Sequence, residues 1–368
     1  MRMRSPGSAT VLCASALSHC ASIRMSAIPT AKPEERPLFS FGVIADVQWA
    51  DTDDGSNYDK TVMRRYRGAF RTLERAVGWW NLLLEPPTFI AQLGDIIDGV
   101  NVDLGQSDSA LEAALAALRC APCPAVSIVG NHELYNFDRA QLARASGEGA
   151  WLKHGDKEFH SFAPAAGWRV VVLDPYQLAL IGHAQDDPRR LAAVDLIGRE
   201  NPSVDPSGAG GEWFKDVTGY NRRFVPYNGG LGGEQLTWLR AELAAAAAAS
   251  ERVVIMCHVI LHPKACGGGT MVWDYPEALE VRDTSGLTLT LTLTLALALT
   301  PTLTLTLTLT LTLSRASPPF PSSRALPDAP TAARDHTWPR WRSSARGLIC
   351  TSSGWAVTPL RCAQYVST

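Results

Sequence analysis

The 368-residue chain has no excess of charge of either sign. Its 34 Lys and Arg residues nearly balance its 36 Asp and Glu residues, so the formal net charge at pH 7 is -2. A nucleic-acid-binding protein needs a basic surface, and this balance argues against nucleic acid as a partner. Charged residues make up only 19% of the chain and hydrophobic residues 46%, which predicts a sizeable buried core rather than a disordered chain.

Cysteine is also sparse. The eight cysteines include a single CxxC pair, formed by Cys120 and Cys123, whereas a zinc ribbon needs two such pairs. Eight cysteines in a chain of this length do not make a disulfide scaffold either, and we expect them to be reduced.

Composition divides the chain into four segments. Residues 1–36 are rich in Arg, Ser and Ala and have no acidic residue before Glu34, which is typical of a transit peptide. The alternative is an untranslated leader, with Met25 as the true start. We expect a cytoplasmic protein, with an organelle as the alternative location if the leader is a targeting segment.

The third and fourth segments are of low complexity. Residues 286–314 are mostly a Leu-Thr alternation, and a period of two predicts a strand with one apolar face. The run exceeds the usual length of a strand, roughly ten residues at most, and a translated nucleotide repeat is the favoured interpretation. Thr at every second position argues against a membrane span. Residues 315–368 are rich in Pro, Ser, Arg and Trp, and we predict that they are disordered or are out-of-frame sequence.

The second segment, residues 37–285, has the pattern of a layered α/β domain. Continuous apolar runs bounded by polar residues predict strands whose two faces are both covered, and helical stretches lie between them. The predicted strands are 38–45, 88–93, 125–129, 168–173 and 252–256, and the predicted helices are 63–81, 109–119 and 233–249.

Polar side chains follow four of these strands at the point where each strand ends. Open α/β sheets bind ligands at the carboxyl ends of their strands, so these side chains are expected to meet at one rim. Oxygen donors with one imidazole suit Mn²⁺, Mg²⁺ or iron, with Zn²⁺ also possible. The predicted metal ligands are Asp46, Gln48, Asp95, Asn131 and His258.

Charge suggests how these ligands share two cations. Asp95 is expected to bridge both metals, because a carboxylate has two oxygens and a full negative charge. Asp46 with Gln48 would serve one metal, and Asn131 with His258 the other. Two divalent ions about 3.5–4 Å apart activate water and clamp phosphoryl oxygens.

Two further residues are predicted to be catalytic. His132 is the candidate acid for the leaving oxygen, and Asp98 is expected to hold its ring and favour the protonated form. Each short motif alone is common in turns. The conjunction of all four at strand ends, in order and within one domain, is what supports a metal site.

This order of motifs resembles the calcineurin-like metallophosphoesterases. Their signature is DxH, GDxxD, GNH[DE], a lone His and GHxH. The first four motifs appear here as 46–48, 94–98, 130–133 and His258, with Gln48 in place of the usual His. The resemblance implies a two-layered β-sandwich flanked by helices, with a binuclear metal centre.

The segments 44–51, 92–99, 130–137 and 227–230 are similar to those of the manganese-dependent ADP-ribose/CDP-alcohol diphosphatases. This resemblance covers residues 39 to about 283. It implies two metal ions, with Mn²⁺ expected, and a small nucleotide-diphosphate substrate, either ADP-ribose or CDP-choline, CDP-ethanolamine or CDP-glycerol. Candidate substrate contacts are Tyr135, Asn136 and Asn228; Arg64 either contacts phosphate or lies on a helix surface.

The last family motif, GHxH, is missing. His336 is the single histidine after residue 283, and no glycine precedes it. In the family those two histidines complete both metal shells, and the strands that carry them are also replaced here by low-complexity sequence. We therefore predict an enzyme by ancestry with little or no activity. The alternatives are another phosphoesterase of the same superfamily, acting on a monoester or cyclic diester, and a non-catalytic nucleotide-binding remnant.

Overall fold

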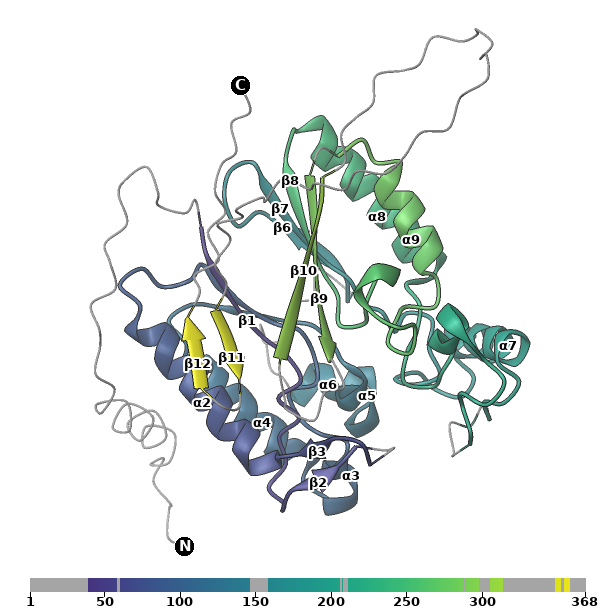
Figure 1. Ribbon diagram of the computed structural model, residues 1–368, viewed down its shortest axis with the longest axis horizontal. Coiled ribbons are helices and arrows are strands. Elements are labelled where there is room, and N and C mark those ends of the chain that lie inside the picture. Colours follow the sequence, from purple (N-terminus) through teal and green to yellow (C-terminus); the bar gives the residue numbers. More distant parts are fainter. Residues whose placement is uncertain are drawn as a thin grey trace, which may run out of the picture.

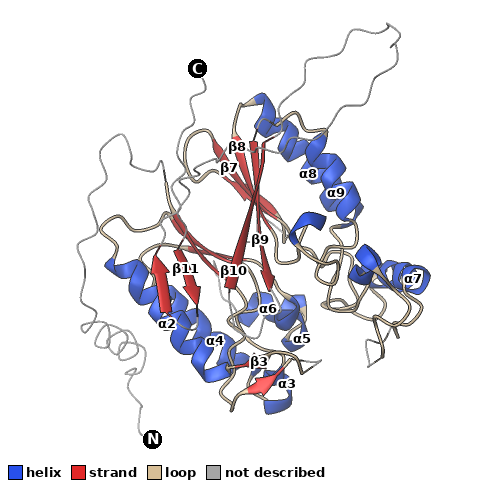
Figure 2. Cartoon of the chain, viewed as in Figure 1, coloured by secondary structure: helices blue, strands red, loops and turns tan. Residues whose placement is uncertain are grey.

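A computed structural model describes residues 39–57, 60–145, 158–205, 207 and 211–287, and the backbone of four further strands at 289–297, 305–313, 348–351 and 354–357. In this part of the chain two β-sheets pack face to face, and helices cover their outer faces (Figures 1 and 2). The predicted α/β sandwich flanked by helices is confirmed.

The first sheet is parallel and has the order β1-β4-β5, formed by Phe41–Ile44, Phe89–Gln92 and Ala125–Ser127. Its outer face packs on α2 (Tyr66–Leu82) and α4 (Ser107–Arg119). Ile44 and Ile90 lie in the core against these helices, whereas Phe89 and Ala91 lie in the core between the sheets. Both faces are buried, which explains the continuous apolar strands.

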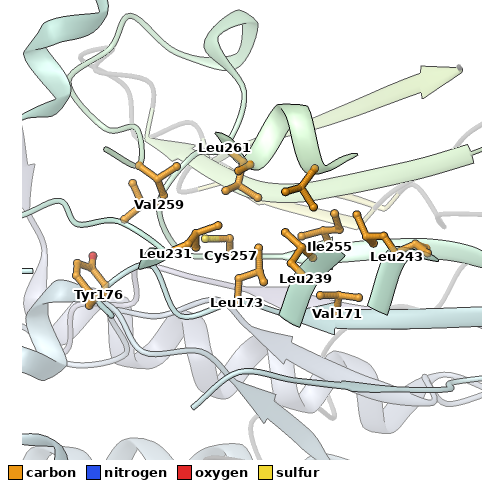
Figure 3. Packing of buried hydrophobic residues seen from close by; sticks show 14 of the residues in the cluster. Val171, Leu173, Tyr176, Leu231, Leu239, Leu243, Ile255, Cys257, Val259 and Leu261 are labelled. Carbon is orange, nitrogen blue, oxygen red and sulfur yellow. The ribbon is translucent and has the colours of Figure 1, made fainter. Parts of the chain in front are cut away.

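The second sheet has the order β10-β9-β8-β7-β6, with β7, β8 and β9 parallel to one another and β6 and β10 antiparallel at the edges. Helices α8 (Gly232–Ala248) and α9 (Tyr275–Asp283) cover its outer face. Figure 3 shows Leu239 and Leu243 of α8 against Val171 and Ile255 of the sheet. The strands are β6 (His160–Phe162), β7 (Trp168–Val172), β8 (Arg252–Met256), β9 (Leu289–Leu297) and β10 (Leu305–Leu313).

The remaining elements are short or lie outside the two layers. Helices α3 (Val100–Leu104), α5 (Asn131–Asn136) and α6 (Arg139–Ala145) belong to the motif loops, and α7 (Pro188–Glu200) covers a separate small core. The others are β2 (Gly55–Ser56), β3 (Met63–Arg64), β11 (Leu348–Thr351), β12 (Gly354–Val357) and the 3-10 helices η3 (Gly219–Arg223) and η4 (Pro263–Ala265).

The Leu-Thr tract forms two nine-residue strands, β9 and β10, each within the usual length of a strand. β9 pairs in parallel with β8, with Leu291 in register with Val254 and Leu293 with Met256. Val254 and Met256 belong to the core between the sheets, so the tract continues the sheet where the loss of closing strands was expected.

Two smaller predictions need correction. The helix predicted at 63–81 begins at Tyr66, because Met63–Arg64 pairs with β2. Within residues 315–368, for which disorder stays a prediction, β11 and β12 form an antiparallel hairpin. Cys120 is disulfide-bonded, although Cys123, Cys257 and Cys266 are free. The leader 1–36 and His336 lie outside the described residues.

No helix within the described ranges is long and apolar enough to cross a membrane.

Candidate metal centre

The loops after β1 and β4 run side by side at the carboxyl ends of the parallel strands. The N–H of Asp46 donates to the Gly94 carbonyl at 3.0 Å, and the N–H of Gln48 donates to the Asp95 carbonyl at 2.8 Å. Asp46, Gln48 and Asp95 have φ angles of 50°, 51° and 56°, a region that non-glycine residues rarely adopt. Strained backbone of this kind concentrates at functional sites, and here it falls on three predicted metal ligands.

Two motif glycines permit the loops to approach one another. A Cβ on Gly130 would lie 2.1 Å from Asp95 Oδ1, and a Cβ on Gly94 would lie 2.4 Å from His258 Nδ1. Gly94 also has a φ of 100°, which a side chain disfavours. The glycines of the Gly-Asp and Gly-Asn-His motifs are therefore required by close packing around Asp95 and His258.

Lone-pair donors from three strand ends converge. His258 Nε2 lies 3.2 Å from Asn131 Oδ1 and 3.6 Å from Asp95 Oδ1. His258 Nδ1 lies 2.7 Å from the carbonyl oxygen of Leu93, which only accepts hydrogen bonds, so Nδ1 carries a proton. In the neutral ring Nε2 is then an acceptor aimed at two oxygens, the arrangement that orients a histidine toward a metal.

Asp46 and Gln48 complete the predicted ligand set. Gln48 Nε2 donates to Asp95 Oδ2 at 3.4 Å. Burial raises the pKa of both Asp46 and Asp95 to about 6, although the imidazole of His258 opposes the shift. Burial opposes charge on His258, but the two carboxylates outweigh it and raise the pKa of its ring. Negative charge is thus concentrated where a cation would relieve it.

The donor chemistry fits a hard divalent cation, but the set depends on amides. Among the residues that the structure describes, no three His, Cys, Asp or Glu side chains form a metal-binding group by themselves. Gln48 and Asn131 are needed beside Asp46, Asp95 and His258. Amide and carboxylate oxygens suit Mn²⁺ better than they suit a thiophilic metal.

Sequence reasoning gave Glu133 no role, yet this residue organises the rim. Its carboxylate has no exposed surface and accepts hydrogen bonds from the N–H groups of Asp95, Ile96 and Gly130 at 2.8, 2.7 and 2.8 Å. Burial, and then the charge of Asp95, raise its pKa to about 7. The signal was available, because Glu133 is the third residue of α5 and its carboxylate accepts from the N–H of the N-cap residue Gly130, as the glutamate of a capping box does.

His132 lies beside the cluster, but Asp98 does not hold it as predicted. His132 Nδ1 accepts a hydrogen bond from the N–H of Gly99 at 2.8 Å, so the proton of the neutral ring is on Nε2. The Asp98 carboxylate is 3.4 Å from Nδ1 and instead accepts from Arg64 Nη1 at 2.5 Å. Burial lowers the pKa of His132 well below its usual value, and Arg64 and His258 lower it further, which disfavours the expected protonated ring.

Arg64 lies beside His132 and not on a helix surface, so phosphate contact is the alternative that stays open. It precedes α2 rather than lying on a helix surface. Its Nη2 is 3.5 Å from His132 Nε2, and its side chain is 23% exposed. Asp98 therefore positions a guanidinium beside the cluster, where it adds a fixed positive charge.

Of the three candidate substrate contacts, one lines the site and two are hydrogen-bonded within loops. The Tyr135 side chain is 42% exposed, and its ring stands edge-on to His132 with centroids 5.2 Å apart, so it lines the site. The Asn136 amide donates to the carbonyls of Asp98 and His132 and accepts from Ser107. Asn228 is 1% exposed and donates to the carbonyls of Arg223 and Gly269. These two asparagines brace loops, because the whole Asn136 amide and the NH₂ group of Asn228 are bonded to protein.

This fold is that of a metal-dependent phosphoesterase. The sequence model of the calcineurin-like phosphoesterase family matches residues 39–261, and the chain belongs to that family.

Relatives narrow the comparison further. Proteins named manganese-dependent ADP-ribose/CDP-alcohol diphosphatase are 36% identical in Xenopus tropicalis, over 68% of this chain and 76% of the relative, and 35% identical in Arabidopsis thaliana, over 67% and 76%. The human protein of that name is 33% identical, over 66% of this chain and 72% of its own. A crystal structure described as a dimetal phosphatase from Danio rerio is similar, with a TM-score of 0.61 and 33% identity over 70% of this chain and 88% of that one.

Proposed function

We propose that this chain is a pyrophosphate hydrolase by ancestry, acting on ADP-ribose and CDP-alcohols with two divalent metal ions, Mn²⁺ foremost, and that its turnover is strongly reduced. The supporting observation is the convergence of Asp95, Asn131 and His258 within 3.2–3.6 Å at one rim. The names of the relatives support the substrate class and the metal.

The chain's own residues supply binding and proton transfer. When bound, two divalent cations neutralise phosphate oxygens and lower the pKa of water. Arg64 presents a partly exposed guanidinium to an anionic phosphate. His132 is a neutral ring that carries its N–H on Nε2, 3.8 Å from Asp95 Oδ2, so it can donate a hydrogen bond to a phosphate oxygen, and water would supply the proton to the leaving group. Tyr135 offers an exposed ring beside the site for a base or sugar.

Reduced turnover follows from the missing GHxH. Each metal lacks one imidazole that the family supplies. Loss even of residues that only support a ligand costs about 10–100-fold in metal affinity, and loss of a ligand itself is expected to cost more. A chain that binds nucleotide without hydrolysing it is therefore the second candidate.

A metal titration of the purified full chain tests both candidates. Mn²⁺ per chain is measured by metal analysis, ADP-ribose and CDP-choline hydrolysis by chromatography, and an aryl phosphate serves as the general phosphoesterase substrate. We expect weak Mn²⁺ binding and slow hydrolysis of the two diphosphates only. His258→Ala should abolish both, whereas His262→Ala, on the same loop but with its ring accepting from the N–H of Lys264, should abolish neither.

The outcomes separate the possibilities. Two tightly bound Mn²⁺ with rapid turnover would refute the impairment. ADP-ribose binding without turnover in excess Mn²⁺ would favour the binding remnant. A preference for the aryl phosphate would indicate another phosphoesterase.

A further inference from the structure

The end of β7 carries none of the predicted motifs, yet it delivers one side chain to the metal centre. Tyr176, four residues beyond this strand, is fully buried in the core beneath α8 and is labelled in Figure 3. Its hydroxyl donates to Asn131 Oδ1 at 3.4 Å, and its ring centroid is 6.3 Å from that of His258.

The backbone of Tyr176 is fixed on both sides. Its N–H donates to Asp174 Oδ1 at 2.9 Å, and its carbonyl accepts from Arg139 Nη2 at 2.7 Å and from His183 Nε2 at 2.8 Å. Asp174 is held in turn by Arg139 Nη1 at 2.8 Å and by the side chain of Gln235, which bonds both its N–H and its carbonyl. So many restraints on one residue leave its hydroxyl little freedom to move.

An asparagine ligand has an orientation problem that a carboxylate does not have. One side of the amide is an acceptor oxygen and the other is an NH₂ donor, and rotation by 180° exchanges them. A cation needs the oxygen, whereas the NH₂ group repels it. A phenol donates one hydrogen bond at neutral pH, and its donation to Oδ1 marks this atom as the one that faces His258 Nε2.

We infer that Tyr176 is a positioning residue that holds the Asn131 amide with its oxygen toward the metal shared with His258. This inference rests on the proposed function, because it assigns Tyr176 to the same metal centre. It goes beyond that function because it assigns a role to the end of β7, the one predicted strand that carries no motif. Tyr176 itself contacts neither substrate nor the reacting atoms.

A double-mutant cycle tests the inference by Mn²⁺ affinity, measured by calorimetry and by the electron spin resonance of free Mn²⁺. Tyr176→Phe keeps the buried ring and removes the hydroxyl. We expect about 10–100-fold weaker binding of one Mn²⁺ and little change at the other. Tyr227→Phe is the matched control, because this hydroxyl donates to the Gly269 carbonyl at 2.8 Å, outside the cluster, and its removal should leave Mn²⁺ affinity unchanged.

The second arm of the cycle uses Asn131→Asp, which replaces the amide by a carboxylate with two equivalent oxygens. In that background Tyr176→Phe should cost less than about threefold, because orientation no longer matters. An equal loss in both backgrounds, or no loss in either, would overturn the inference while leaving the proposed function intact. An unmodified chain that binds no Mn²⁺ would overturn both.

Discussion

The motif loops of the metal centre and the β9–β10 hairpin differ in how the sequence fixes their geometry. In the rim of motif loops, individual residues have individual partners: Glu133 collects three backbone N–H groups, and Gly130 leaves room for one carboxylate. In the β9–β10 hairpin, Leu lies opposite Leu and Thr lies opposite Thr or Ala along the whole ladder. A two-residue shift restores the same pairing there, whereas no shift is compatible with the rim. Unique contacts fix the positions of individual atoms in the motif loops. Periodicity fixes only which residues share a face of the strand, and it leaves the register open.

The largest expected effect comes from filling the space at Gly130. Gly130→Ala places a methyl group 2.1 Å from Asp95 Oδ1 and 2.6 Å from the Asp95 backbone nitrogen. The loop must move, at a cost of about 3 kcal/mol in the free energy of unfolding, and Mn²⁺ binding should be lost. Urea unfolding and calorimetry measure the two effects. Gly233→Ala is the control, because its Cβ would meet nothing within 4 Å on α8; equal behaviour of the two variants would contradict the close-packing argument.

Metal removal should make the stability of the rim depend on pH. Asp46 and Asp95, with a pKa of about 6, and Glu133, with a pKa of about 7, all lie above their unfolded values of 3.8 and 4.5. The folded chain therefore binds more protons than the unfolded chain in this interval, and its stability falls as the pH rises from about 4 to 7. The raised pKa of His258 acts in the same direction, and the lowered pKa of His132 opposes it.

Thermal unfolding in the presence of a chelator measures this dependence. We expect the midpoint to fall by several degrees between about pH 5.5 and 7.5, since one kcal/mol corresponds to about 2–4 °C in a domain of this size. Mn²⁺ favours ionised ligands and should recover part of the loss at the higher pH. A midpoint that rises with pH under chelation would show that the carboxyls are not protonated in the folded state.

The smallest effect should come from shortening the Leu-Thr tract by one repeat. Deletion of Leu291 and Thr292 together preserves the period, so β9 can pair again with β8 after a two-residue shift. We expect the free energy of unfolding to change by less than about 0.5 kcal/mol. Deletion of Thr292 alone moves every later Leu of β9 to the opposite face and should be clearly more destabilising. Equal effects in urea unfolding would mean that β9 is not held by its periodicity.

The sequence by itself located five buried strands and five metal-ligand candidates at their ends, because these features are local. Apolar runs mark buried strands, and ligands of an α/β sheet follow strand ends. It also showed the absence of GHxH, a matter of residue identity alone. Glu133 was within reach of the same reasoning through its capping position.

Only the tertiary structure decided which neighbours each side chain meets. Asp98 accepts a hydrogen bond from Arg64 rather than from His132. Asn136 and Asn228 donate to backbone carbonyls. Tyr176 donates to Asn131, which is 45 residues away in the sequence. Hydrogen-bond partners depend on distance in space and on competition among buried polar groups, and neither is encoded in a short window of residues. The place of β9 beside β8 was undetermined for the same reason, since a uniform alternation contains no information about its partner.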